Sequence, residues 1–363
     1  MKPYRIMLTG FVLGGFIAPG LCQTNQEAIS STQIEKTAVK TNINKIGITY
    51  NMGFNFKVDF RNLGGLQLSD PGPSTGSAVN RNYDNGYNRV DSSGNQGGLT
   101  WNWGYTSPNS AQPGSLTLQS DATPATAKSG TYQEGVEHGG EIFYAREMIR
   151  REKWRGGLQA AFGYTAISIK DEETLSYYIN RTSDRFDIGS VVLPLPPYRG
   201  SFQGPGPLIS SDLTPSQRST TVLQGAATIY GSREMHTDLF SLRLGPYFEI
   251  PLHPKWSILI DGGLFLAFAN SRFKYQETVT ISDPAYGINL TSAARSDLHS
   301  ETEFLVGGYA GASISYAISE KVGVFVGARF QSAGQAVNKT DGKKSILDLG
   351  NSIIASVGAS YSF

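Results

Sequence analysis

Apolar and polar residues alternate strictly through residues 46–60. Every second position from Ile46 to Phe60 is apolar or aromatic, and the positions between them are small or polar. Successive side chains on a β-strand point to opposite faces of the sheet, so this segment predicts a strand with one apolar and one hydrophilic face. A helix of the same sequence would scatter both classes around its circumference.

Seven further segments alternate in the same way, less regularly, at residues 136–150, 155–169, 237–252, 256–270, 301–318, 322–333 and 353–363. The links between these eight predicted strands also alternate, in length. Short links lie near Arg151–Trp154, Leu252–Lys255 and Ser319–Lys321. Long links lie at 61–135, 170–236, 271–300 and 334–350. This order of long and short links is typical of an up-and-down barrel with one trimmed rim.

The strand lengths distinguish two all-β architectures. Strands of a soluble β-sandwich average about 5–6 residues, whereas the segments above are long enough to cross an apolar band of about 25 Å when tilted. Outer-membrane barrels combine an even strand count with short periplasmic turns and long extracellular loops. We therefore predict a transmembrane antiparallel up-and-down β-barrel over residues 46–363, with the soluble sandwich as the alternative.

The strand count is eight, with ten as the alternative. Leu99, Trp101, Trp103 and Tyr105 alternate within the long link 61–135, as do Leu116 and Leu118. Each arm of such a hairpin has only about seven residues, short of the 9–11 or so that a spanning strand needs. We expect a hairpin within the loop.

The chain ends in Tyr361-Ser362-Phe363, with apolar residues at every second position back to Ile353. This ending resembles the C-terminal recognition signal that the assembly machinery of Gram-negative outer-membrane barrels reads. With eight predicted strands and, at residues 1–22, a positively charged start followed by an apolar stretch as in an export signal, the chain is similar to the small OmpA/OmpX type of outer-membrane barrel. The resemblance implies an outer-membrane location, contact with outer-membrane lipid and lipopolysaccharide, and assembly by the barrel assembly machinery through Tyr361 and Phe363. The long links 61–135 and 170–236 depart from that minimal type.

Residues 1–22 have the features of a secretory signal peptide. Lys2 and Arg5 precede an apolar stretch from Ile6 to Ile17, which is too short to span a bilayer. Cleavage after Cys22 would remove the single cysteine, whereas a lipoprotein anchor on Cys22 is the alternative. We expect residues 23–45 to form a periplasmic N-terminal tail.

The composition agrees with an exported barrel and excludes some functions. Gly 42, Tyr 18 and Phe 18 are high for 363 residues, while charged residues make up only 17%. The net charge of +1 offers no electrostatic case for nucleic acid, which we do not expect as a partner.

Charged residues on the predicted inner face form the first set of candidate site residues. We expect a polar network inside the barrel made of Glu141, Arg243, Glu249, Asp261, Glu303 and Arg329. Buried charges are tolerated when they are paired, so Glu141 should bridge Arg243, Arg329 or both. A path for protons or ions along the carboxylates is the alternative.

Two histidines are weak catalytic candidates. His299 alternates with Glu301 and Glu303 onto one face, and His236 precedes Asp238. Outer-membrane hydrolases place His beside acidic or Ser partners at such rims. No spacing here singles out a nucleophile, so we predict a protein that is not an enzyme.

Three loop features are candidates for binding. Asp91-Ser-Ser93-Gly-Asn95 has the spacing of a calcium loop but lacks its glycine and glutamate, so we expect neither metal nor cofactor. The proline-rich stretch 194–208 predicts a stiff extended loop. Aromatic residues predicted to be exposed suit carbohydrate or protein contact, or pack the loops together: Tyr83, Tyr87, Trp101, Trp103 and Tyr198.

The sequence thus predicts a non-enzymatic outer-membrane barrel, envelope-structural or surface-binding through its long extracellular loops. The alternatives are an outer-membrane hydrolase of lipid or peptide with a rim histidine, and a narrow pore.

Overall fold

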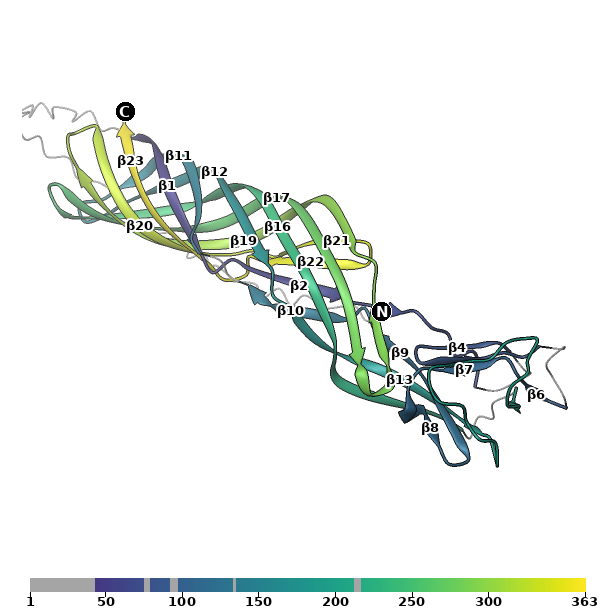
Figure 1. Ribbon diagram of the computed structural model, residues 1–363. Helices are drawn as coiled ribbons and strands as arrows, with labels where there is room; N and C mark the ends of the chain where they lie inside the picture. Colours follow the sequence, from purple (N-terminus) through teal and green to yellow (C-terminus); the bar gives the residue numbers. More distant parts are fainter. Residues whose placement is uncertain (1–42, 75–78, 92–96, 133–134, 212–216) are drawn as a thin grey trace, which may run out of the picture. The chain divides into compact units, whose positions relative to one another are not determined.

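The computed structural model describes residues 43–363 except 75–78, 92–96, 133–134 and 212–216. In it, eight antiparallel strands follow one another around a ring. Figure 1 labels these strands. The eight are β1 (Asn44–Phe54), β11 (Glu137–Arg150), β12 (Arg155–Asp171), β16 (Arg218–His253), β17 (Trp256–Asp283), β19 (Arg295–Ala317), β20 (Val322–Ser332) and β23 (Ser352–Ser362). Each pairs with the next, and β23 pairs with β1. The predicted all-β antiparallel fold is confirmed.

The pairing of the strands is staggered, so that paired residues shift along the strands from one strand to the next around the ring. From Gly53 on β1, partners lie in turn on β23, β20, β19, β17, β16, β12 and β11, where Glu147 donates its N–H to Ile43. The path therefore returns to the first strand ten residues before its start. A stagger of this kind, with tilted strands, is what closure of a sheet into a barrel requires.

The outer surface of the ring carries an apolar band that begins near the short turns and ends at a row of polar residues. Phe240, Phe268 and Phe304 lie side by side on β16, β17 and β19, and all three rings are exposed. Two residues further along the same strands, the outward positions are Asp238, Asn270 and Thr302. Toward the short turns the exposed side chains remain apolar, among them Ile48, Ile142, Phe162, Leu244, Leu264, Val306, Val326 and Val357.

Beyond that polar row the strands continue, and their apolar face changes side. The sequence predicts loops at 170–236 and 271–300, but β16 is 36 residues long and β17 is 28, so much of both segments is strand. In this extension the inward side includes buried apolar side chains, among them Met235, Phe273 and Val279, together with a few buried polar and charged ones such as Arg233 and Glu277. Water replaces an apolar environment outside, so the apolar face must turn inward.

A second sheet fills the inside of the extension. It comprises β10 (Ala127–Tyr132), β2 (Lys57–Leu63), β22 (Lys343–Asp348) and β21 (Gln335–Thr340), in that order. The prediction of one strand over 46–60 is wrong here, because the chain leaves the wall at Asn55, whose φ of 64° is left-handed. Phe56, Val58 and Phe60 thereby join the core instead of the outer face.

The remaining strands form a distal region that we call the head. It contains the sheet β14 (Tyr198–Arg199), β7 (Trp103–Tyr105), β5 (Gly86–Asn88), β4 (Arg81–Tyr83), and the pair β6 (Leu99–Thr100) with β15 (Ile209–Ser210). These pack on β9 (Ser115–Thr123) and β13 (Leu175–Asp187), which pair with each other and join the ring sheet through β16. Short pieces complete it: β3 (Leu66–Gln67), η1 (Pro108–Ser110), β8 (Ala111–Gln112), η3 (Pro284–Tyr286) and β18 (Ile288–Thr291).

The predicted hairpin between residues 99–105 and 116–118 is wrong. β7 pairs with β5 and β14, whereas Leu116 and Leu118 lie on β9, which pairs with β13. Their side chains meet in one core rather than across one ladder. In the part of the chain that the structure describes, no helix is long and apolar enough to cross a membrane.

Candidate functional site

The ring encloses a cluster of four charged side chains. Arg243 donates from Nε and Nη2 to the two oxygens of Glu141, with 2.9 Å between Nε and Oε2. Its Nη1 lies 3.1 Å from Asp261 Oδ2, and Arg329 Nη1 lies 3.4 Å from Glu141 Oε2. Two guanidinium groups thus face two carboxylates, and the Tyr309 ring lies 4.6 Å from the Arg243 guanidinium carbon. The structure brings together the four predicted residues Glu141, Arg243, Asp261 and Arg329.

Above this cluster the interior is apolar. Phe265 and Ala267 of β17 point inward there and meet a core that includes Phe56, just before β2, Val58 of β2 and Leu347 of β22, all at most 2% exposed. The charged cluster borders a cavity of about 70 Å³. A wider cavity of about 170 Å³ lies at the short-turn rim, beside Lys45, Glu249 and Trp256. The polar part of the interior therefore faces the short-turn end.

Glu249 and Glu303, predicted in the same network, lie elsewhere. Glu249 sits near the short-turn rim, where it accepts from Lys45 Nζ at 3.3 Å and Ser257 Oγ at 2.7 Å. Glu303 lies in the extension and accepts the backbone N–H of Val337 at 2.9 Å. Glu303 therefore faces the second sheet, whereas Glu249 lies on the opposite side of the charged cluster, toward the short turns.

The two histidines occupy different surroundings. His236 Nε2 lies 3.9 Å from Asp238 Oδ1, and the Tyr164 hydroxyl donates to that same carboxylate oxygen at 2.6 Å. His299 is exposed on β19, and its carbonyl oxygen accepts from Asn338 Nδ2 at 3.2 Å. Asp297, two residues away, has a lowered pKa because it accepts hydrogen bonds from the Thr340 hydroxyl and from the Leu298 N–H. Neither histidine lies in the lumen cluster.

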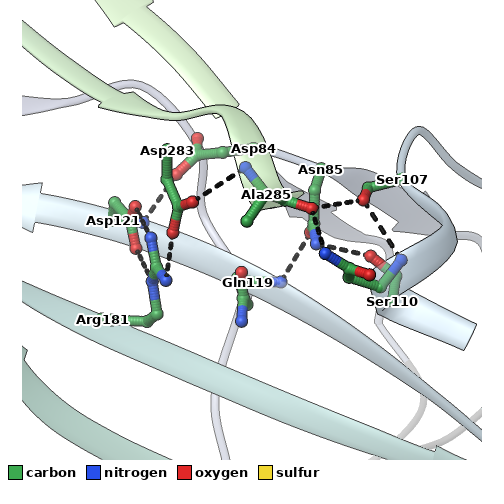
Figure 2. A network of polar contacts seen from close by, with 10 residues as sticks. Asp84, Asn85, Ser107, Ser110, Gln119, Asp121, Arg181, Asp283 and Ala285 are labelled. Atoms are coloured by element: carbon green, nitrogen blue, oxygen red, sulfur yellow. Dashed lines mark hydrogen bonds and ion pairs between the residues drawn. The ribbon is translucent and has the colours of Figure 1, made fainter. Parts of the chain in front are cut away.

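A polar network ties the head to the end of the β17 strand (Figure 2). Arg181 of β13 donates from Nε and Nη2 to the two oxygens of Asp121 at 2.8 and 2.7 Å, and from Nη1 to Asp283 at 2.7 Å. Asp121 is fully buried. The carbonyl oxygen of Ala285 accepts from Ser107 Oγ at 2.7 Å and from Asn109 Nδ2 at 2.8 Å. The residues that these bonds connect are 60 to 178 positions apart in sequence.

One carboxyl group in the same network, that of Asp84, has a raised pKa. Burial raises the pKa of Asp84, and the charge of Asp121 adds to that rise. The Asp121 N–H, which donates to Asp84 Oδ2 at 2.6 Å, and Arg181 act in the opposite direction. Sequence patterns did not single out Arg181, Asp121 or Asp283, because their pairing depends on strands that meet only in three dimensions.

Most of the aromatic residues predicted to be exposed pack the head together. Trp103 is 0% exposed and Tyr83 6%, whereas Tyr87, Trp101 and Tyr198 are partly covered. Trp103 Nε1 donates to Pro207 O at 2.8 Å, and its ring lies 4.6 Å from that of Tyr198. The loop prolines thus serve as acceptors for the head core, and the aromatic rings offer little open surface for a ligand.

The strand β23 brings Tyr361 and Phe363 to the start of β1. Asn44 and Phe363 exchange backbone hydrogen bonds of 3.2 and 2.9 Å, so the C-terminal residue pairs with the first barrel strand. The rings of Tyr361 and Phe363 are exposed and stacked, with 6.3 Å between their centroids.

Two predictions concern metals and the chain start. Among the described residues, no group of three or more His, Cys, Asp or Glu side chains is placed to hold a metal ion. The calcium-like segment 91–95 lies mostly outside the described residues, as do the signal peptide and nearly all of the tail 23–45.

Comparison with known proteins gives weak likenesses to outer-membrane proteins. No family model and no curated protein matches the sequence. Ail, the attachment invasion locus protein of Yersinia pestis, solved with the heparin analogue sucrose octasulfate, is 11% identical with a TM-score of 0.27, over 88% of this chain and 97% of Ail. The outer membrane protease OmpT of Escherichia coli is 9% identical with a TM-score of 0.27, over 91% and 99%. A FadL homologue of Pseudomonas aeruginosa is 7% identical with a TM-score of 0.17, over 89% and 91%.

Proposed function

We propose that this chain is a Gram-negative outer-membrane barrel that acts without catalysis and presents its head to a partner outside the cell. The observation that carries the proposal is the change of apolar face along single strands. On β17, Leu264 and Phe268 are exposed on the outer surface, whereas Phe273 and Val279 of the same strand are buried inside. A strand that passes from lipid into water needs this change, because its outer side chains meet hydrocarbon first and water afterwards.

The head supports the binding part of the proposal. Its strands are held by a dedicated apolar core and by the Arg181 network, so its surface is ordered before any partner arrives. The lumen cluster and the apolar core above it favour a barrel that stabilises and carries the head over one that conducts. The outer band would contact membrane lipid and lipopolysaccharide, and Tyr361 and Phe363 would present the assembly signal.

The test is fractionation of cells that make the protein, followed by electrophoresis of the outer-membrane fraction in SDS with and without boiling. We expect a band that shifts with heat, as closed barrels resist SDS until they are boiled. Protease added to whole cells should cut in the head and leave the segment Phe240–Phe268 intact. A periplasmic protein without a heat shift would contradict the proposal.

A further inference from the structure

An apolar protrusion on the head stands out among the described residues. In the segment 191–197, which we call the tip loop, Val192 is 86% exposed and Leu195 is 91% exposed. These are the highest values of any large apolar side chain on the described surface, the outer band of the barrel included. Apolar groups that project so far into water are informative when they lie together, because folding normally covers part of each one.

The tip loop is held in place by its neighbours. Tyr105 donates its hydroxyl to Pro194 O, and Val191 N donates to Ile188 O at 3.1 Å. Val191 and Leu193 pack against the head core, and Tyr198 then enters β14 against β7. Val192 and Leu195 are therefore projected by a fixed backbone, and a partner would not have to order the loop.

The backbone of the tip loop has few donors to lose from water. Pro194, Pro196 and Pro197 carry no N–H, and the N–H of Val191 is already bonded. Dehydrating an unpaired N–H is costly in hydrocarbon, and this segment contains few of them.

Two cationic side chains lie near the chain that follows the tip loop. Tyr87 donates its hydroxyl to Gly200 O at 2.8 Å, and the guanidinium of Arg89 lies 4.9 Å from the centre of the Tyr87 ring. Burial raises the pKa of Tyr87, and the charges that act on it are those of Arg89 and exposed Arg199, both of which lower it. Two cations, Arg89 and exposed Arg199, therefore lie near Tyr87, whose hydroxyl is bonded to the chain just after the tip loop.

We infer that the tip loop inserts Val192 and Leu195 into the outer leaflet of a lipid bilayer apposed to the cell, with Arg89 and Arg199 at its anionic headgroups. The inference rests on the proposed function, since it names the partner of the head. Aliphatic side chains supply the apolar attraction, and the arginines supply attraction to negative charge, about 1 kcal/mol for each cation near such a surface.

The experiment uses the full chain in nanodiscs of neutral lipid, mixed with phosphatidylcholine vesicles that contain or lack phosphatidylserine. Binding is measured by flotation of the vesicles. We expect binding to vesicles with phosphatidylserine, and a loss of about 100-fold in Val192→Ser/Leu195→Ser, about tenfold for each side chain. Val222→Ser, which alters another exposed aliphatic residue outside the tip loop, should bind like the unmodified chain.

A second measurement tests whether the tip loop itself enters the bilayer. Because Cys22 is the only cysteine, Leu195→Cys in a Cys22→Ser background accepts one polarity-sensitive dye. The inference predicts a blue shift on adding vesicles. The inference would be overturned if the double variant bound vesicles like the unmodified chain, or if the dye showed no blue shift. A blue shift that appears without vesicles and grows with protein concentration would also overturn it, and would assign the surface to a second copy of the chain. Equal binding to vesicles with and without phosphatidylserine would contradict the role of the arginines. Arg199→Gln tests the same role and should weaken binding to vesicles that contain phosphatidylserine. A chain that does not enter nanodiscs would instead contradict the proposed function.

Discussion

Arg243 in the lumen faces two carboxylates, those of Glu141 and Asp261. In Arg243→Met the cluster keeps both carboxylates and one guanidinium, that of Arg329. Breaking a buried ion pair costs about 3–5 kcal/mol, because a charge is left without compensation. We expect the temperature at which the SDS-resistant band unfolds to fall by several degrees.

Adding Glu141→Gln to Arg243→Met provides the control. The double variant removes one charge of each sign, so it should recover part of the lost stability. An unchanged transition in Arg243→Met would contradict a stabilising role for this pair.

Like Arg243 in the lumen, Arg181 in the head faces two carboxylates, those of Asp121 and Asp283. We expect Arg181→Met to destabilise the head by about 3–5 kcal/mol, since Asp121 is fully buried. The barrel should keep its heat-dependent band shift while protease cuts the head faster. Simultaneous loss of the band shift would show that the head and the barrel unfold as one unit.

Asp84 predicts a dependence on pH. Its pKa is raised in the folded state by burial, so protonation favours folding, and that contribution is lost as pH rises through the raised pKa. Asp84→Asn keeps an acceptor for Asp121 N–H and removes the charge. We expect the variant to resist proteolysis better than the unmodified chain at pH 8, with the difference vanishing toward pH 4. An equal difference at both pH values would exclude this cause.

At the scale of elements, the break between β1 and β2 decides which environment an apolar residue meets. Ile48 is 63% exposed on the outer band, while Phe60 is fully buried in the core of the extension. Phe60→Ala should cost about 3–5 kcal/mol, because it leaves a cavity. Ile48→Ala removes contact with lipid and leaves no cavity, so about 1–2 kcal/mol is expected. Equal losses in thermal unfolding would favour one continuous strand over 46–60.

For the whole molecule, the interior predicts that the barrel does not conduct. Any path would cross the cluster around Arg243 and then the core formed by Phe56, Phe60 and Phe265. We expect planar bilayers that contain the purified protein to show no discrete conductance steps. Steps that appear in the unmodified chain and change size in Arg243→Met would contradict this expectation and favour the narrow pore.

Alternation along the sequence was sufficient to predict the ring strands, because one polar and one apolar face suffice to define a β-strand. The short turns near 151–154 and 319–321 were predicted as well. The same rule placed Glu141, Arg243, Asp261 and Arg329 on the inner face, and the structure joins them. It also assigned Phe56, Val58 and Phe60 to the outer face, where they do not lie.

The sequence by itself determined that this chain is built of long antiparallel strands with two unlike faces, since that property is local and repeats every second residue. Only the tertiary structure decided what each face meets. The inward turn at Asn55, the pairing of β9 with β13 and the bonds of Arg181 to Asp121 and Asp283 join residues that are distant in sequence. A local pattern contains no information on such contacts, because the same alternation suits lipid, water or a second sheet on its apolar side.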